Sequence, residues 1–336
     1  MTAGAASGRC GGMREGTEKL IIGQGLAGSC LGWEFMRRGV DFRIADRGVG
    51  GSSRVAAGMV NPITGKNFEP SWRIGEFHPQ AIAFYRSLEA EFGVRLWHPL
   101  PVLRLASSEK EWAKISSKLG LPQTTPWLGS QATPTPEGFI GSVELSGGGW
   151  LDTKAFLNIT RDHFSALGLF VEMDAETHPC RIRCEGAAGL MGGSLGEHRC
   201  AKGEILTVRA EWPETHIRIG AGGWLVPIGG GLFRVGSTYE WDQLDEEPTA
   251  AGLGRITEIA MRLGGADFGV VDHVAGIRPI LRRSQPLIGQ DRDGNWVLNG
   301  FGSKGTLYAP GMAAMLADWI LEGKQPHPDF ILPVLP

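Results

Sequence analysis

The glycine-rich stretch at residues 23–28, Gly-Gln-Gly-Leu-Ala-Gly, constrains the fold of this chain more than any other feature. An apolar run at 20–22 precedes it, and a helical pattern extends from it to about Arg38. A second apolar run at 42–45 then ends on Asp46. Strand, glycine turn, helix, strand and acid, in this order, predict the first part of a parallel α/β sheet that binds a dinucleotide.

The three glycines of this stretch have different physical roles. Gly23 permits a sharp turn, Gly25 lets a pyrophosphate approach a backbone without a Cβ, and Gly28 lets the helix lie close to the strand. The helix N-terminus at Leu26 and Ala27 offers N–H groups and a partial positive charge to the phosphates.

Asp46 follows the first glycine by about 20 residues, where a carboxylate accepts hydrogen bonds from the hydroxyl groups of a ribose. A glycine triplet alone is weak evidence in a chain with 51 glycines, because ordinary turns contain the same residues. The flanking strands, helix and acid favour a nucleotide site. The fingerprint continues to Gly32. It suits FAD at least as well as NAD and does not choose between them.

Composition limits the class of protein. The chain has 336 residues, enough for one large or two ordinary domains, with 42% hydrophobic and 21% charged residues, as in a globular protein. A net charge of −3 without a run of Lys or Arg gives no indication of a nucleic-acid partner. The five cysteines are odd in number and lack a C-x-x-C pair. This pattern indicates free thiols in a reducing compartment, and we expect a cytoplasmic protein.

The sequence also predicts several absences. Cys180 and Cys184 lie on a strand-like segment near His178 and His198, and core packing is favoured there over a metal site. Residues 1–17 lack the apolar segment of a signal peptide and predict a disordered lead-in. No apolar run is long enough to predict a membrane span.

A glycine and serine run at 48–53 follows Asp46, and its N–H and hydroxyl groups suit a phosphate or a ring edge. The small residues in 55–62, Val-Ala-Ala-Gly-Met-Val-Asn-Pro, let a flat group approach the backbone. Together with Ala45-Asp46-Arg47, these segments resemble the D-amino-acid oxidase (DAO) family of flavoproteins. That family includes glycine oxidase, sarcosine oxidase and the oxidase domain of a tRNA-modifying enzyme.

The resemblance implies FAD as the cofactor. It implies that Ser52 and Ser53 contact the pyrophosphate and that Ala57 and Gly58 lie near the isoalloxazine ring, and it includes Arg47 among the cofactor-binding residues. No cysteine near the last glycine motif matches the covalent flavin link of sarcosine oxidase, so we expect non-covalent FAD.

The middle of the chain predicts further helices and a second sheet. The predicted helices are 71–93, 109–119, 152–166 and 250–263. The predicted strands are 97–106, 139–145, 169–173, 182–184, 202–208, 217–219, 223–227 and 232–237. The strand at 182–184 leads to Gly186, which the resemblance implies to be near the adenosine half of FAD, although an ordinary turn explains it equally well.

The C-terminal third contains two motifs of chemical interest. Gly276-Ile277-Arg278-Pro279 resembles the Gly-x-Arg-Pro signature of the amino-acid oxidases, in which the arginine binds the substrate carboxylate with its planar fork. A loop-bracing arginine is the alternative, and Arg282 and Arg283 are nearby.

A second strand at 296–298 leads to a second glycine turn and a helix to about Leu321. In the resembled family this helix N-terminus points at the pyrimidine end of the flavin, where positive potential favours the reduced anion. Lys304 adds charge or assists oxygen activation there, unless it is a surface lysine. The cofactor-binding residues implied are Gly300, Gly302, Ser303, Lys304 and Gly305.

We therefore predict an α/β fold, in which an FAD-binding Rossmann-like nucleotide domain is interleaved with an antiparallel-sheet substrate domain. The nucleotide domain comprises 18–66, 150–200 and 276–325, the substrate domain 67–149 and 201–275, and the tail 326–336. The expected reaction is FAD-dependent oxidation of an amino acid or secondary amine, with hydride transfer from the α-carbon to flavin N5 and an imine product.

Several alternatives stay open. They are a dehydrogenase that reduces a carrier or quinone, a tRNA-modifying type of oxidase and a non-catalytic flavin-binding protein. The chain has three tyrosines, and the tyrosine pair of D-amino-acid oxidase has no evident match. Tyr239 is a single weak candidate, so the substrate stays undetermined.

Overall fold

A computed structural model of the chain describes residues 18–48, 50–65, 67–129, 134–172, 178–193, 195, 197–282 and 285–331. The predicted lead-in at 1–17, residues 332–336 of the predicted tail and Arg283 lie outside the described residues. The chain divides into two compact units. The first consists of Met1–Gly51, Leu157–Cys200 and Arg278–Pro336, and the second of Ser52–Phe156 and Ala201–Ile277.

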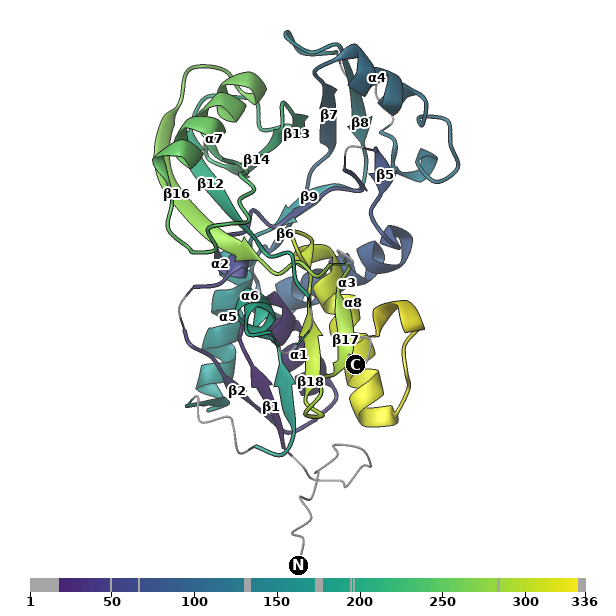
Figure 1. Ribbon diagram of the computed structural model, residues 1–336, viewed down its shortest axis with the longest axis vertical. Coiled ribbons are helices and arrows are strands. Elements are labelled where there is room, and N and C mark those ends of the chain that lie inside the picture. The colour runs from purple at the N-terminus through teal and green to yellow at the C-terminus, as the bar shows by residue number, and fades with distance from the viewer. Residues whose placement is uncertain are drawn as a thin grey trace, which may run out of the picture. The chain divides into compact units, whose positions relative to one another are not determined.

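The first unit contains a six-stranded sheet with the strand order β10-β2-β1-β11-β18-β17 among the described residues (Figure 1). Its strands from β10 to β18 are parallel, and β17 is antiparallel to β18. The strands are β1 (Lys19–Ile22), β2 (Phe42–Ala45), β10 (Phe170–Val171), β11 (Arg181–Arg183), β17 (Leu287–Gln290) and β18 (Trp296–Asn299). Because β1, β2, β11 and β18 are parallel, their carboxyl ends meet at one edge of the sheet, which we call the carboxyl edge.

Helix α1 (Leu26–Arg37) contacts two helices that are distant from it in the sequence. Trp33 of α1 donates a 2.9 Å hydrogen bond to Thr160 of α5 (Thr153–Ala166). Arg38, which follows α1, forms a 2.6 Å ion pair with Asp318 of α8 (Gly305–Glu322). In Figure 1, α5 and α8 lie on opposite sides of α1. The short helices α6 (Gly186–Met191) and η3 (Pro328–Phe330, a 3₁₀ helix) complete the described helices of this unit.

The second unit is built on a seven-stranded, largely antiparallel sheet with the order β16-β12-β15-β14-β13-β7-β8 in the described part of the chain. Its strands are β7 (Val102–Ala106), β8 (Gly141–Leu145), β12 (Ala201–Arg209), β13 (Ile217–Gly220), β14 (Gly223–Gly229), β15 (Leu232–Gly236) and β16 (Gly269–Arg278). Among the strand pairs that the structure describes in this sheet, β13 and β7 are the parallel one. The smaller sheets consist of β3 (Met59–Val60), β9 (Gly149–Leu151) and β6 (Trp97–Pro99), and of β4 (Ile63–Thr64) and β5 (Glu69–Pro70).

Both faces of the seven-stranded sheet are buried. Side chains of β7 alternate between the two faces: Leu103 and Leu105 pack in a core with helix α7 (Ala250–Leu263), whereas Val102 and Ala106 pack in a second core. The two cores together account for the predominantly apolar strands of this unit. Its other helices are α2 (Ser52–Val55), α3 (Ile74–Phe92), α4 (Glu109–Ser116) and the 3₁₀ helix η1 (Thr125–Trp127).

The predicted fold class is confirmed, although the structure divides one predicted strand and adds several elements. The single strand predicted at 97–106 is two strands, β6 and β7. Pro99 and Pro101 lie at the break, and proline has no N–H to donate to a neighbouring strand. Strand β16 lies outside the predicted strands, and its first four residues, which include Val270 and Val271, are exposed.

Gly28 lies where α1 crosses β1, and this crossing is too close for any other residue. A Cβ at this position would lie 1.9 Å from the carbonyl oxygen of Gly23 and 3.1 Å from the side chain of Ile21. Gly254 of α7 provides a contrast, because nothing lies within 4 Å of the corresponding position.

We predict that Gly28→Ala lowers the free energy of unfolding by about 1–3 kcal/mol, because the backbone must move to admit the methyl group. Gly254→Ala should instead raise it by up to about 1 kcal/mol, because alanine is the better helix former. The midpoints of urea denaturation measure both effects. A Gly28→Ala variant with an unchanged free energy of unfolding would contradict the close crossing.

Candidate functional site

Glycine turns follow three of the parallel strands at the carboxyl edge. Gly23 follows β1 with a φ of +98°, Gly186 follows β11 with a φ of +57°, and Gly300 follows β18 with a φ of +82°. Such left-handed conformations favour glycine because other residues carry a Cβ. Asp46 follows β2 at the same edge.

Direct contacts join these turns to one another. A Cβ at Gly23 would lie 2.7 Å from the carbonyl oxygen of Cys184 at the end of β11. Asn299 at the end of β18 donates a 3.0 Å hydrogen bond from Nδ2 to the carbonyl oxygen of Gly186. The structure therefore brings together three glycine turns that are far apart in the sequence.

The N-termini of α1 and α8 are also neighbours. A Cβ at Gly305 would lie 2.9 Å from Cδ1 of Leu26. Helix α1 begins after Gly25 and α8 after Lys304; for the described residues, neither start has a side-chain cap or an acidic residue in the first turn. Both helix ends can therefore offer backbone N–H groups to an anion without competition from a carboxylate in the helix.

These observations suit a dinucleotide pyrophosphate and therefore fit FAD. The remaining predicted residues of the two turns differ in exposure. Leu26 and Ala27 are buried and support the helix start, whereas Ser303 and Arg47 are exposed.

Asp46 is held by neighbouring groups. Its carboxylate accepts 2.8 Å hydrogen bonds from the backbone N–H groups of Gln24 and Gly48, and it forms an ion pair with Arg161 of α5. Arg161 belongs to none of the sequence motifs described above. An arginine in a helix more than 100 residues away carries no local signal of this contact, and only the packing of α5 beside α1 reveals it.

Arg278 ends β16, and 9% of its surface is exposed. The carbonyl oxygen of the next residue, Pro279, accepts a 2.9 Å hydrogen bond from the N–H of Gly302. The structure therefore joins the Gly-Ile-Arg-Pro motif to the second glycine turn. Arg282 differs, because it is exposed and paired at 2.6 Å with the equally exposed Glu197.

Lys304 is half-buried at the start of α8 and is therefore not a fully exposed surface lysine. Burial lowers the pKa of its ammonium group. Four residues further along α8, burial raises the pKa of the Tyr308 phenol.

In the second unit, Ser52 and Ser53 begin α2, and Ala57 and Gly58 follow it. Gly58 has a φ of +68°, and a Cβ there would lie 1.9 Å from the carbonyl oxygen of Leu151. This packing requires glycine whether or not a flat ligand binds. The sequence could not reveal it, because Leu151 is distant in the chain.

Arg234 of β15 fixes the same segment. Its guanidinium group donates hydrogen bonds to the carbonyl oxygens of Val55, at 3.1 Å, and of Ala56. The hydroxyl group of Thr153 also donates to Ala56, at 3.2 Å. Burial lowers the pKa of Arg234, while Asp152 and Asp272 oppose this shift.

Tyr239, the weak substrate candidate, lies in the second unit and is 43% exposed. Its ring centroid is 5.8 Å from that of Trp241, which is also exposed. Nothing in this arrangement distinguishes a substrate contact from a surface aromatic pair.

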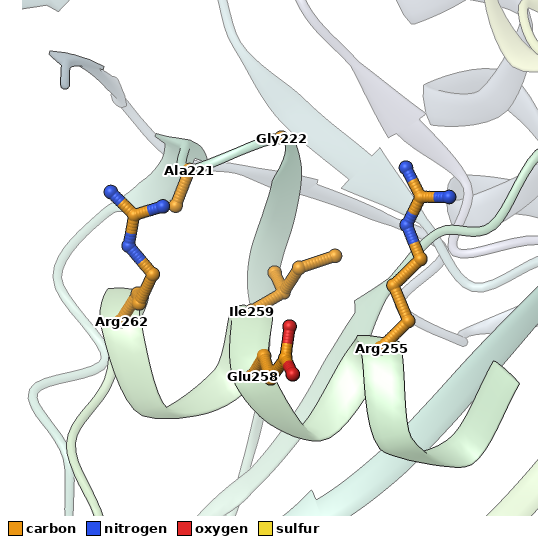
Figure 2. Close-up of a pocket in the computed structure, with 6 residues that line it drawn as sticks. All are labelled: Ala221, Gly222, Arg255, Glu258, Ile259 and Arg262. Carbon is orange, nitrogen blue, oxygen red and sulfur yellow. The ribbon is translucent and has the colours of Figure 1, made fainter. Parts of the chain in front are cut away.

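A hollow of about 110 Å³ lies elsewhere in the second unit, between α7 and the turn at Ala221 and Gly222. Figure 2 shows the side chains of Arg255 and Arg262 on either side of Glu258. None of the predicted site residues lines it.

The described residues contain no cluster of three or more His, Cys, Asp and Glu side chains placed to hold a metal ion. Cys180 and Cys184 are buried as free thiols, and burial raises the pKa of Cys184. Among the described helices, none has the length and apolar character needed to cross a bilayer.

Comparisons with known proteins agree with the resemblance seen in the sequence. The DAO family model, described as FAD dependent oxidoreductase, matches residues 19–319. The solved structure of glycine oxidase from Geobacillus kaustophilus has a TM-score of 0.76 at 20% identity, covering 94% of this chain and 98% of that one. Iminodiacetate oxidase from Chelativorans sp. BNC1 has a TM-score of 0.75 at 17% identity, covering 93% and 98%.

A curated relative is the tRNA 5-methylaminomethyl-2-thiouridine biosynthesis bifunctional protein MnmC of Idiomarina loihiensis. It is 22% identical over 334 residues, with 88% of this chain and 54% of the relative covered. The chain thus spans about half the length of this curated relative.

The lowered pKa of Lys304 leads to a prediction about stability. The ordinary pKa is 10.5, so the unfolded chain binds this proton more tightly than the folded protein. The charged lysine therefore costs stability below its lowered pKa, and this cost disappears as the pH rises through 10.5.

We expect Lys304→Met to raise the free energy of unfolding of the ligand-free protein more at neutral pH than at a pH near 10.5, as measured by urea denaturation. The exposed Lys324 provides the control variant, Lys324→Met. If the free energies of unfolding of Lys304→Met and wild type differ by the same amount at every pH, burial of the charge does not contribute to that difference.

Proposed function

The chain belongs to the DAO family of FAD-dependent oxidoreductases, and from this premise we propose that it oxidises the C–N bond of an amino acid or a secondary amine. The observation that carries the proposal is the buried Arg278, whose neighbour Pro279 is hydrogen-bonded to the second glycine turn. Solved structures similar to this one include a glycine oxidase and an iminodiacetate oxidase, whose named substrates are both amines with a carboxylate.

We assign the FAD-binding role to the carboxyl edge of the first unit. Gly23, Gly25 and Gly28 and the N-terminus of α1 would hold the pyrophosphate. Asp46 would accept a hydrogen bond from the ribose, and Gly186 would lie near the adenosine half. Gly300, Gly302, Ser303 and Gly305 at the start of α8 would approach the flavin.

The segments predicted as the nucleotide domain, 18–66, 150–200 and 276–325, overlap largely with the first unit. Residues 52–66, 150–156 and 276–277 belong instead to the second unit. Ser52, Ser53, Ala57 and Gly58, all in the first of these three segments, are proposed to contact FAD on the basis of the family pattern. The seven-stranded sheet is proposed as the substrate domain.

Arg278 would bind the substrate carboxylate. A guanidinium fork matches a carboxylate with two parallel hydrogen bonds, and an ammonium group does not. FAD, when bound, supplies the acceptor for hydride from the substrate α-carbon, and an imine is the product. The protein's contribution is orientation of a deprotonated amine, so we assign no general acid or base.

The start of α8 would contribute positive potential near the flavin. The helix N-terminus has no acidic residue in its first turn, and the half-buried Lys304 adds an ammonium group. A cation and a helix N-terminus both stabilise a neighbouring anion. We therefore propose that Lys304 affects the flavin environment rather than substrate binding.

A second candidate substrate is a modified tRNA base, because the curated relative takes part in tRNA modification. Several phosphate contacts by Lys and Arg are the usual basis of tRNA affinity, and the chain has a net charge of −3 without a basic run. This charge balance favours a free amino acid or amine.

The test is anaerobic reduction of the purified flavoprotein by glycine, sarcosine, proline and D- and L-amino acids. The loss of flavin absorbance measures the reduction. We expect at least one of them to bleach the flavin and acid precipitation to release FAD. Oxygen consumption compared with dye reduction then separates an oxidase from a dehydrogenase. Bound FAD that none of these compounds reduces would count against the proposal and favour a tRNA substrate or a non-catalytic protein.

We predict that Arg278→Ala leaves the flavin spectrum unchanged and raises the substrate concentration needed for half-maximal flavin reduction at least tenfold. One hydrogen bond to a charged group contributes about 1.5–3 kcal/mol, and about 1.4 kcal/mol corresponds to a factor of ten. Arg278→Lys should recover part of the loss, because lysine keeps the charge without the planar fork.

The exposed Arg282 is the matched control, and Arg282→Ala should have little effect. Wild-type substrate affinity in Arg278→Ala would show that the carboxylate binds elsewhere. Loss of FAD from this variant would show that Arg278 is a structural brace.

A further inference from the structure

We propose that Arg161 positions the Asp46 carboxylate so that Asp46 binds the adenosine ribose of FAD through one hydroxyl group only. The proposal rests on the proposed function, because it requires FAD at the carboxyl edge. It concerns a residue in α5 to which the sequence pattern assigns no role.

The hydrogen bonds of Asp46 limit what its carboxylate can still accept. Oδ1 accepts the N–H of Gln24, and Oδ2 accepts the N–H of Gly48, both at 2.8 Å. Oδ2 also accepts a hydrogen bond from Nη2 of Arg161. A carboxylate has about four lone-pair sites, so about one remains, on Oδ1.

Arg161 is held in place by more than this ion pair. Its Nε donates a 3.0 Å hydrogen bond to Oε1 of Gln24, and its guanidinium carbon lies 4.7 Å from the centroid of the Phe170 ring. Gln24 is itself fixed, with 2% of its surface exposed and its Nε2 donating to the carbonyl oxygen of Leu157 at 2.9 Å. A ribose that bound Asp46 through two hydroxyl groups would have to displace Arg161 from Asp46. The contacts of Arg161 with Gln24 and Phe170 oppose this displacement.

The position of Asp46 adds an electrostatic role for Arg161. Gln24, whose N–H contacts Asp46, directly precedes Gly25, the cap residue of α1. The carboxylate therefore lies beside the helix N-terminus at which a pyrophosphate would bind, and two negative charges would repel each other there. The guanidinium group of Arg161 offsets the charge of Asp46.

The ribose contact requires the adenosine half of FAD, which FMN lacks, so binding of FMN provides an internal comparison. We expect Arg161→Ala to weaken FAD binding by the apoprotein about tenfold or more, in fluorescence titrations. Binding of FMN, which lacks the adenosine ribose but keeps one phosphate, should weaken by a smaller factor than binding of FAD. Arg161→Lys should recover part of the FAD affinity, and Lys154→Ala, on an exposed position of the same helix, should leave both affinities unchanged.

FAD analogues with a 2′-deoxy or a 3′-deoxy adenosine test the single contact directly. Only one of the two deletions should weaken binding to the wild-type protein. In Arg161→Ala a second lone-pair site is released, and both deletions should then matter. Equal losses for the two analogues with the wild-type protein would overturn the proposal, as would an Arg161→Ala variant that loses FMN and FAD affinity alike.

These outcomes are separable from a failure of the proposed function. FAD binding with the expected analogue pattern, without reduction by any amine, would support the role of Arg161 and contradict the proposed oxidation. A protein that binds neither FAD nor FMN would overturn both.

Discussion

The approach of α1 to β1 is the contact on which the candidate site depends. The carbonyl oxygen of Gly23 occupies the space that a Cβ at residue 28 would need, so the helix lies directly against the turn that starts it. The position of α1 then determines where its N-terminus and Asp46 lie. Through Trp33 it determines the position of α5, and through the contact between Leu26 and Gly305 that of α8.

The sequence predicted those parts of the fold whose causes are local. Helices α5 and α7 begin and end close to the predicted residues, and the carboxylate of Asp152 caps α5 by accepting a 2.9 Å hydrogen bond from the N–H of Ala155. The spacing of apolar residues and a polar cap are properties of a few consecutive residues, and one sequence displays them.

The contacts that the sequence did not predict are those between distant segments. Arg161 reaches Asp46, Leu151 excludes a side chain at Gly58, and Arg234 holds the carbonyl oxygens of Val55 and Ala56. None has a signal in its own neighbourhood. Gly58 also shows that one residue can satisfy two explanations, because the small side chain expected beside a flat ligand is required by backbone packing alone.

The order of the strands in the first sheet has a consequence for how this protein is made. Strand β1 leaves the ribosome before β11, which is one of its two neighbours, with Leu20 opposite Arg181. Parallel pairing across about 160 residues must await synthesis of the intervening chain, and such long-range contacts slow folding. Until then the apolar residues Leu20 and Ile21 have an unpaired strand edge, so the nascent chain is exposed to aggregation in this interval.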